Sequence, residues 1–253
     1  MSDTDSALAE NTTLLDRLGI RSRPAGTPII HQTWGKLLFI HWPIKAELLR
    51  PLIPQRLEID TYNGTAWIAV VPFTMWNIRP HLLPALPVIS QAHELNVRTY
   101  VHYDGVPGVW FLSLDINQIS GVFFGRYVYH LPYFRAKIDL TQESNTIHYD
   151  LVRSDAQKPA EFSASWTIGD ELPKAHPDSL EFFLSERYCL YSAGGDSLYR
   201  ARIFHQPWTL REATLSHLRS SMIESFDLPT PVSEPLLHYA ESLDVSIWWL
   251  TKL

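Results

Sequence analysis

Short β-prone segments separated by tight-turn signals run through most of the sequence, and this pattern constrains the fold more than any other feature. Asn63-Gly64 lies between two such segments, and Asn-Gly supplies the positive φ values of a two-residue hairpin turn. Similar signals occur at residues 104–108 and 194–196. Many short strands joined by tight turns, with few helices between them, are typical of antiparallel, barrel-like domains.

Only a few segments favour helix. We predict short helices over residues 44–52, 116–130 and 179–187, the last capped by Asp178. Residues 79–89 contain three prolines and are expected to form an apolar loop. The 253 residues fit one large domain, so we expect a partly ordered lead-in over 1–30 and a single domain over 31–253. The predicted fold is mainly β (α+β): an antiparallel β-barrel-like domain with a few short helices.

Charge and composition exclude several classes of protein. The net charge is −6 and no cluster of Lys and Arg occurs, which argues against nucleic-acid binding. Cys189 is the only cysteine, and the eleven histidines show no metal-ligand spacing, so we expect no disulfide, metal or cofactor. The acidic N-terminus does not resemble a signal peptide, and no apolar run approaches the ~20 residues of a membrane helix. We therefore expect a cytoplasmic protein without a membrane partner, and homo-oligomer formation stays open.

The segment 93–102 is the most informative candidate strand. Its alternate residues fall on two faces, one of which is apolar. If the other face meets solvent, Glu94 and Arg98 are a surface pair of little energetic value. If it lines a barrel interior, the same two residues are available to orient a ligand, and their burial would itself indicate a site.

Several motifs connect this strand to known families. Residues 93–136 resemble the central block of the acetoacetate decarboxylases: a strand that opens with a glutamate, a hairpin, a strand that ends in Asp, a helix with Gly-Arg, and a proline turn. The chain resembles the YqjF-like family of uncharacterised bacterial proteins more closely. That resemblance rests on "HWP" (41–43), "AWIAVVPFTM" (66–75), "ELNVRTYV" (94–101), "PGVWFLSLD" (107–115), "LPYFRA" (131–136) and "HQPW" (205–208).

The resemblance implies a barrel-like fold with a central pocket in which Glu94 matches the decarboxylase's pocket glutamate. It does not imply the decarboxylase activity, which depends on a lysine that forms a Schiff base. In "HLPYFRA", Tyr133 and Phe134 stand where that lysine and its neighbour should be, and a phenol cannot form an imine. Lys137 lies about 13 Å further along the strand and is a poor substitute. We therefore predict that the protein is not a Schiff-base decarboxylase.

The candidate site follows from the strand pattern and the resemblance together. Glu94 and Tyr133 are the candidates for catalysis, and no catalytic residue is assigned. Tyr133 is equally well explained as a filler of the space left by the lysine, and His41 has a structural alternative. Arg126 is expected to tie its helix to the sheet. The residues expected to bind a ligand are His41, Glu94, Asn96, Arg98, Tyr100, Trp110 and Tyr133.

Three functions are compatible with the sequence. The first is a pocket that binds an organic acid or an aromatic compound. The second is an enzyme of lyase, hydratase or isomerase type in which Glu94 and Tyr133 move protons. The third is a structural protein whose pocket is filled by its own side chains, Tyr133 and Phe134 among them.

Overall fold

The computed structural model describes residues 17–82, 91–154 and 157–253. Two predicted segments lie partly outside the described residues: the N-terminal lead-in (1–30), of which 1–16 are not described, and the apolar loop (79–89), of which 83–89 are not described. The strands are β1 (Ile30–Ile44), β2 (Glu58–Ile59), β3 (Ala66–Pro80), β4 (Ala92–Tyr103), β5 (Val106–Ile116), β6 (Tyr133–Glu143), β7 (Thr146–Arg153), β8 (Glu161–Glu171), β9 (Cys189–Gly194), β10 (Ser197–His205), β11 (Leu210–Ser220) and β12 (Leu236–Lys252).

The predicted helices exist but are shorter than expected. They are α2 (Ala46–Leu49) with the 3-10 turn Arg50–Leu52, α3 (Ile119–Val128) and α4 (Leu180–Ser185), and a further 3-10 turn spans Glu224–Phe226. The cap of α4 is Ser179 rather than Asp178, because the Ser179 hydroxyl accepts a hydrogen bond from the Phe182 N–H at 3.2 Å. The expected loop over 79–89 begins later than predicted, since β3 continues through Pro80.

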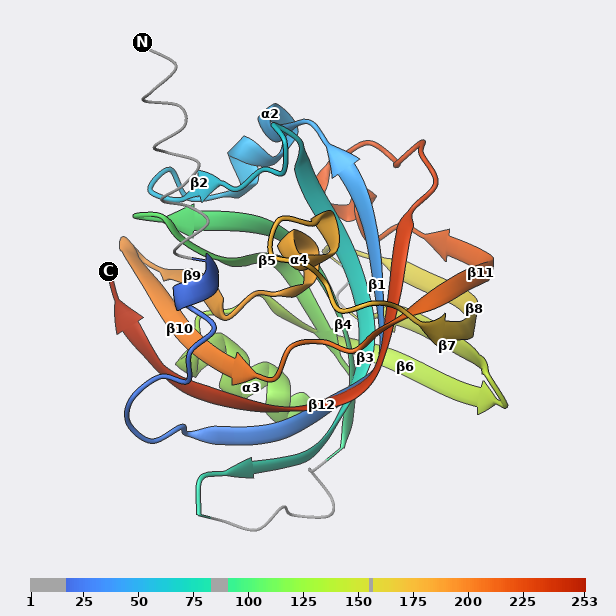
Figure 1. Cartoon of the computed structure of the whole chain (residues 1–253), viewed down its shortest axis with the longest axis horizontal. Helices are drawn as coiled ribbons and strands as arrows, with labels where there is room; N and C mark the ends of the chain where they lie inside the picture. Colours follow the sequence, from blue (N-terminus) through green and yellow to red (C-terminus); the bar gives the residue numbers. More distant parts are fainter. Residues whose placement is uncertain (1–16, 83–90, 155–156) are drawn as a thin grey trace.

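The strands form two rings that share one wall. The pairings β4–β5–β9–β10–β12–β1–β3 close a first ring, because β3 also pairs with β4. A second ring passes from β5 through β6, β7, β8 and β11 to β12. Both rings use β12, β1, β3, β4 and β5, and Figure 1 shows β1 and β12 running beside each other through the molecule. The barrel-like prediction is confirmed.

Two strand pairs depart from the antiparallel pattern. β5 pairs in parallel with β6 and with β9. A parallel neighbour needs a crossover rather than a hairpin, and α3 provides it between β5 and β6. This crossover places α3 beside the first ring.

The predicted tight turns are present. Asn63 and Gly64 have φ values of 49° and 77°, and Asp104 and Gly105 have values of 48° and 75°. The second pair joins β4 to β5 as a hairpin. The Asn63-Gly64 turn closes only a Tyr62–Thr65 bridge, because β2 pairs with β4 instead of β3.

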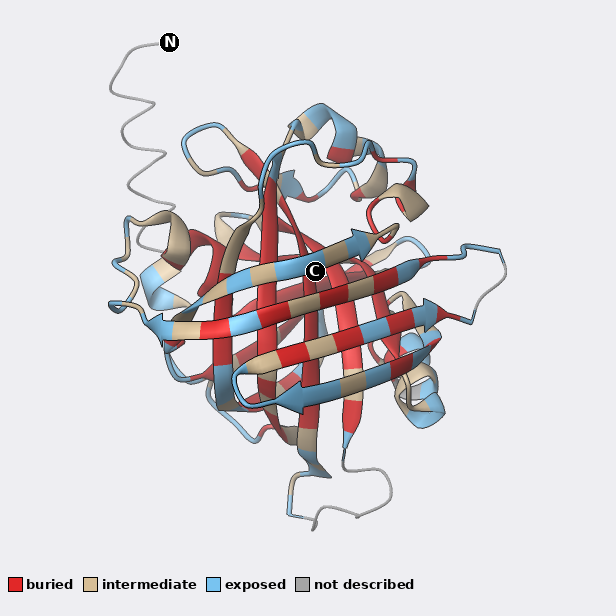
Figure 2. Ribbon diagram, turned by 90° about the vertical axis from the view of Figure 1, so that its right-hand side faces the viewer, coloured by how far each residue is buried: buried red, intermediate tan, exposed pale blue. Residues whose placement is uncertain are grey.

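Burial differs between the shared strands and the outer strands. β7 and β8 alternate between buried and more exposed residues, as expected when one face meets solvent. β3, from Ala66 to Met75, and most of β4 are buried almost continuously, because each of their faces lies inside one of the two rings there. Figure 2 shows alternating strands in front of continuously buried ones. No helix in the described part of the chain is long and apolar enough to cross a membrane.

A buried ion pair links the shared wall to the second ring. Arg153 on β7 donates from Nε to Asp115 Oδ1 at 2.6 Å and from Nη2 to Oδ2 at 2.8 Å, and both side chains are fully buried. The Arg153 guanidinium also lies 4.2 Å from the centre of the Phe134 ring. Such a two-point contact satisfies both charges in a place that water does not reach.

Loss of one member of this pair should strongly destabilise the fold. We expect Asp115→Asn to lower the free energy of unfolding by roughly 3–5 kcal/mol, because Arg153 would keep a buried charge without a carboxylate. The control is Arg219→Met, whose exposed pair with Glu161 spans 3.5 Å and should contribute less than about 1 kcal/mol. Urea unfolding of both variants measures the difference. Equal effects would contradict this account of the pair.

Candidate functional site

A cavity of about 190 Å³ lies inside the first ring. Its walls come from β1, β3, β4 and β5, with further residues from α3, β6, β9, β10 and β12. Most of the lining is aliphatic or aromatic. An apolar cavity of about 150 Å³ in another protein holds benzene, so this one fits a ligand on the order of eight to ten non-hydrogen atoms. The apolar lining includes Trp34, Phe39, Val71, Phe73, Phe111 and Leu114.

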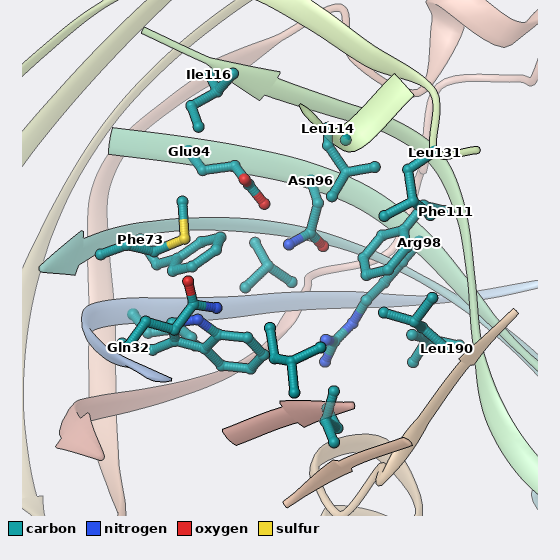
Figure 3. Close-up of a pocket in the computed structure, with 18 of the residues that line it drawn as sticks. Gln32, Phe73, Glu94, Asn96, Arg98, Phe111, Leu114, Ile116, Leu131 and Leu190 are labelled. Carbon is teal, nitrogen blue, oxygen red and sulfur yellow. The ribbon is translucent and has the colours of Figure 1, made fainter. Parts of the chain in front are cut away.

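Three polar residues of β4 form a row along one wall of this cavity. Glu94, Asn96 and Arg98 are exposed by only 2%, 5% and 9%, and Figure 3 shows their side chains extending into the cavity. The alternate residues Leu95 and Val97 point the other way, into the core of the second ring. The interpretation of Glu94 and Arg98 as a surface pair is therefore wrong.

Glu94 holds a proton near neutral pH. Burial raises the pKa of its carboxyl to about 8, with a smaller contribution from Asp115, although a hydrogen bond from Tyr133 acts in the opposite direction. The Tyr133 hydroxyl donates to Glu94 Oε2 at 3.0 Å, and burial raises the pKa of this phenol as well. At pH 7 the pair is a neutral acid beside a neutral phenol, and both can exchange hydrogen bonds with a ligand.

The position of Tyr133 depends on α3. The Arg126 Nε donates to the Tyr133 carbonyl at 2.6 Å, which joins the helix to the start of β6. Gly125 faces the ring of Tyr133, where a Cβ would overlap it. Phe134 faces away, against the Arg153 guanidinium. Tyr133 thus reaches the cavity without filling it, since the space of about 190 Å³ remains.

Arg98 lies in the cavity without a carboxylate partner in the described part of the chain. Its Nε and Nη2 have no hydrogen-bond partner among the described residues, and its guanidinium lies 5.3 Å from the centre of the Phe39 ring. Asn96 Oδ1 likewise has no partner there. Buried polar atoms normally find partners, so the cavity contains polar atoms whose hydrogen-bonding capacity is unused.

Two predicted ligand-binding residues lie behind the cavity wall instead of in it. The Tyr100 hydroxyl donates to the Leu184 carbonyl at 2.9 Å, and His41 Nε2 lies 2.6 Å from the same hydroxyl oxygen. Because the Tyr100 hydroxyl donates its hydrogen to the Leu184 carbonyl, His41 Nε2 is the donor in its contact with the hydroxyl oxygen. Burial, followed by the charge of Arg98, holds the pKa of His41 well below its usual value, so it is neutral. These contacts are those of structural residues.

Trp110 also differs from the prediction. It packs against the core of the second ring and donates from Nε1 to the Leu52 carbonyl at 3.0 Å, while Phe111 lines the cavity. The cause is a bulge in the β4–β5 pairing beside Val97 and Arg98, which shifts the alternation along β5. A regular strand would have placed Trp110 on the same side as Leu114.

Sequence reasoning missed several lining residues. Gln32 and Trp34 come from β1, and Arg187 and His205 come from segments outside the shared wall. Arg187 lies between α4 and β9, where no periodic pattern predicts its direction. The only feature of the sequence that pointed to burial of Arg187 was its place in the half-apolar segment 179–187. No lysine occurs among the described lining residues, and no group of three or more metal-ligating side chains occurs in the described ranges.

The raised pKa of Glu94 predicts a specific pH dependence of stability. Between about pH 4.5 and 8 the folded protein keeps a proton that the unfolded chain has lost, so the wild type loses stability as pH rises. Glu94→Gln lacks this loss. We expect the difference in free energy of unfolding between Glu94→Gln and the wild type to change by roughly 4 kcal/mol, in favour of the variant, when the pH is raised from 5 to 8.

Urea unfolding at several pH values measures this gain, with Glu234→Gln, at an exposed position, as the control. The control and the wild type should follow the same curve. If Glu94→Gln also runs parallel to the wild type, the carboxyl is ionised throughout and the account of this site is wrong.

Residues 31–244 match the model of the DUF2071 family, described as an uncharacterized conserved protein. The uncharacterized protein YqjF of Bacillus subtilis (strain 168) is 41% identical over 231 residues, which cover 91% of this chain and 95% of that protein. This agrees with the resemblance found in the motifs.

Solved structures show the same fold at low identity. The enduracididine biosynthesis enzyme MppR, in complex with pyruvate, is 12% identical, with a TM-score of 0.63 and coverage of 91% of this chain and 93% of that one. The acetoacetate decarboxylase of Legionella pneumophila is 14% identical, with a TM-score of 0.59 and coverage of 95% of each chain. The fold is thus acetoacetate-decarboxylase-like, and the chain belongs to the DUF2071 family of uncharacterized conserved proteins, together with YqjF.

Proposed function

We propose that the protein binds a small organic acid or aromatic compound in the central cavity. The observation that carries this proposal is the row of buried polar side chains in an otherwise apolar space, above all Arg98 with two unpaired donor atoms. Concave, mainly apolar sites with a few fixed polar groups are the usual form of small-molecule sites. Of the similar structures, MppR was solved with pyruvate, which supports a small acid as the first class to test.

Schiff-base chemistry is not part of this proposal. Tyr133 stands where the decarboxylase resemblance places the reactive lysine, the described lining contains no lysine, and Lys137 points to solvent. The nucleophile for an imine is therefore missing from the site.

Turnover is a second candidate function, favoured by the state of Glu94. A carboxylic acid with a pKa of about 8, hydrogen-bonded to a phenol, can donate or accept a proton near neutral pH. Such a pair suits lyase, hydratase or isomerase chemistry on a bound acid. NMR of bound compounds after incubation tests this, and turnover would have to disappear in Glu94→Gln.

Binding can be tested by filling the cavity. Val71 is buried and lines the cavity, so Val71→Phe should occupy part of the space. A keto acid, hydroxy acid or aromatic carboxylate at a hundred times its dissociation constant should add ~2.7 kcal/mol, which is roughly 5–10 °C in the unfolding midpoint of the wild type. The shift should disappear in Val71→Phe.

The control is Val152→Phe, which makes the same change at a residue that is 51% exposed and should keep the full shift. Retention of the shift in Val71→Phe would place binding outside the cavity, and its loss in Val152→Phe as well would mean that the loss does not come from filling the cavity. No shift with any compound would favour the structural alternative.

Borohydride reduction tests the exclusion of Schiff-base chemistry. The wild type, incubated with acetoacetate or pyruvate and then reduced, should show no added mass in the intact protein. An adduct that maps to a lysine by peptide mass spectrometry would overturn this part of the proposal.

A further inference from the structure

A second guanidinium shares one end of the cavity with Arg98. Arg187 also lines the cavity, and the two side chains stack against the same ring: their Cζ atoms lie 5.9 Å and 4.6 Å from the centre of Tyr100. Arg187 is 3% exposed, so both charges lie within the protein. Two buried cations at the same end of a cavity are costly unless an anion compensates them.

The available carboxylates do not compensate both charges. Arg187 Nη1 pairs with Asp60 Oδ2 at 2.6 Å and its Nε donates to the Phe183 carbonyl at 2.7 Å, which leaves Nη2 without a partner among the described residues. Asp60 also pairs with Arg17 through Oδ1. One carboxylate therefore serves two arginines, and within the described ranges Arg98 has none.

The remaining titratable neighbours do not supply the missing charge. His205 lines the cavity, and burial lowers its pKa. Glu186 lies nearby, but its ion pair is with Arg21, at 4.0 Å, and its oxygens accept from the Trp208 N–H at 3.0 Å and from the Tyr188 hydroxyl, so it pairs with neither Arg98 nor Arg187. This end of the cavity thus carries an excess of buried positive charge, which is costly unless a ligand brings an anion.

The other end of the polar row is neutral. Glu94 lies four residues before Arg98 on the same strand, so their backbones are about 13 Å apart. Its carboxylic acid and the Tyr133 hydroxyl suit a carbonyl or hydroxyl group, and Asn96 lies between the two ends with an unpaired Oδ1.

We propose that Arg98 and Arg187 form a carboxylate subsite, and that the ligand is a small monocarboxylate with an apolar middle and a carbonyl or hydroxyl group at its far end. This rests on the proposed binding function and names its ligand class. The carboxylate accepts from Arg98 Nε and Nη2 and from Arg187 Nη2, and the far group meets Glu94 and Tyr133.

Matched acids and amides test the subsite. The probes are 4-hydroxybenzoate against 4-hydroxybenzamide, and 5-oxohexanoate against its amide, measured by calorimetry on the full chain. We expect at least one acid to bind the wild type about tenfold or more tightly than its amide, because the amide has lost the charge and not the shape. That preference should vanish in Arg98→Met and weaken in Arg187→Lys, which keeps the charge and loses the planar fork.

The control is Arg211→Met, since Arg211 bonds the Gly169 carbonyl and does not line the cavity. It should keep the preference for the acid. If acids and amides bind the wild type equally, the binding function stands and the carboxylate subsite is wrong. If neither member of either pair binds, both are wrong for this ligand class.

A measurement without ligand gives an independent check. Arg98→Met removes a buried charge that has no carboxylate partner, so its thermal midpoint should equal or exceed that of the wild type. A large fall in the midpoint would show that Arg98 is structural and would overturn the subsite.

Discussion

The whole site depends on the double burial of β4. This strand is shared by two rings of strands, so Leu95 and Val97 pack in one core while Glu94, Asn96 and Arg98 face the other interior. An alternation that would place polar residues in solvent on an ordinary sheet here places them in a cavity. Burial then raises the pKa of the Glu94 carboxyl and leaves two nitrogens of the Arg98 guanidinium without a partner among the described residues.

The cavity is consequently polarised. A neutral acid and phenol occupy one end, and two guanidinium groups with unpaired donor atoms occupy the other, with aromatic and aliphatic side chains between them. A fold stabilised only by its own contacts would gain from replacing an unpaired buried arginine with an apolar residue. Retention of such a residue is understandable if a ligand completes its contacts.

Much of the fold and part of the site could be predicted from the sequence, for physical reasons. The turn at Asp104 and Gly105 needs positive φ values, and the alternation along β4 has a fixed period, so both were readable from local residues. Trp110 was misplaced because a bulge reverses the alternation of β5, and no local residue type announces it. Arg187 was missed because it lies in an irregular segment that only the tertiary fold brings to the cavity.

The protonation state of Glu94 is the most direct test of this account, because it follows from the same burial that creates the cavity. Infrared difference spectra between the wild type and Glu94→Gln, recorded across pH, isolate the vibrations of this one carboxyl. The account predicts a protonated carboxylic acid at pH 7 that ionises near pH 8. An ionised carboxylate already present at pH 6 would contradict it, since the polar row would then lie in a hydrated environment and the cavity would not be polarised as described.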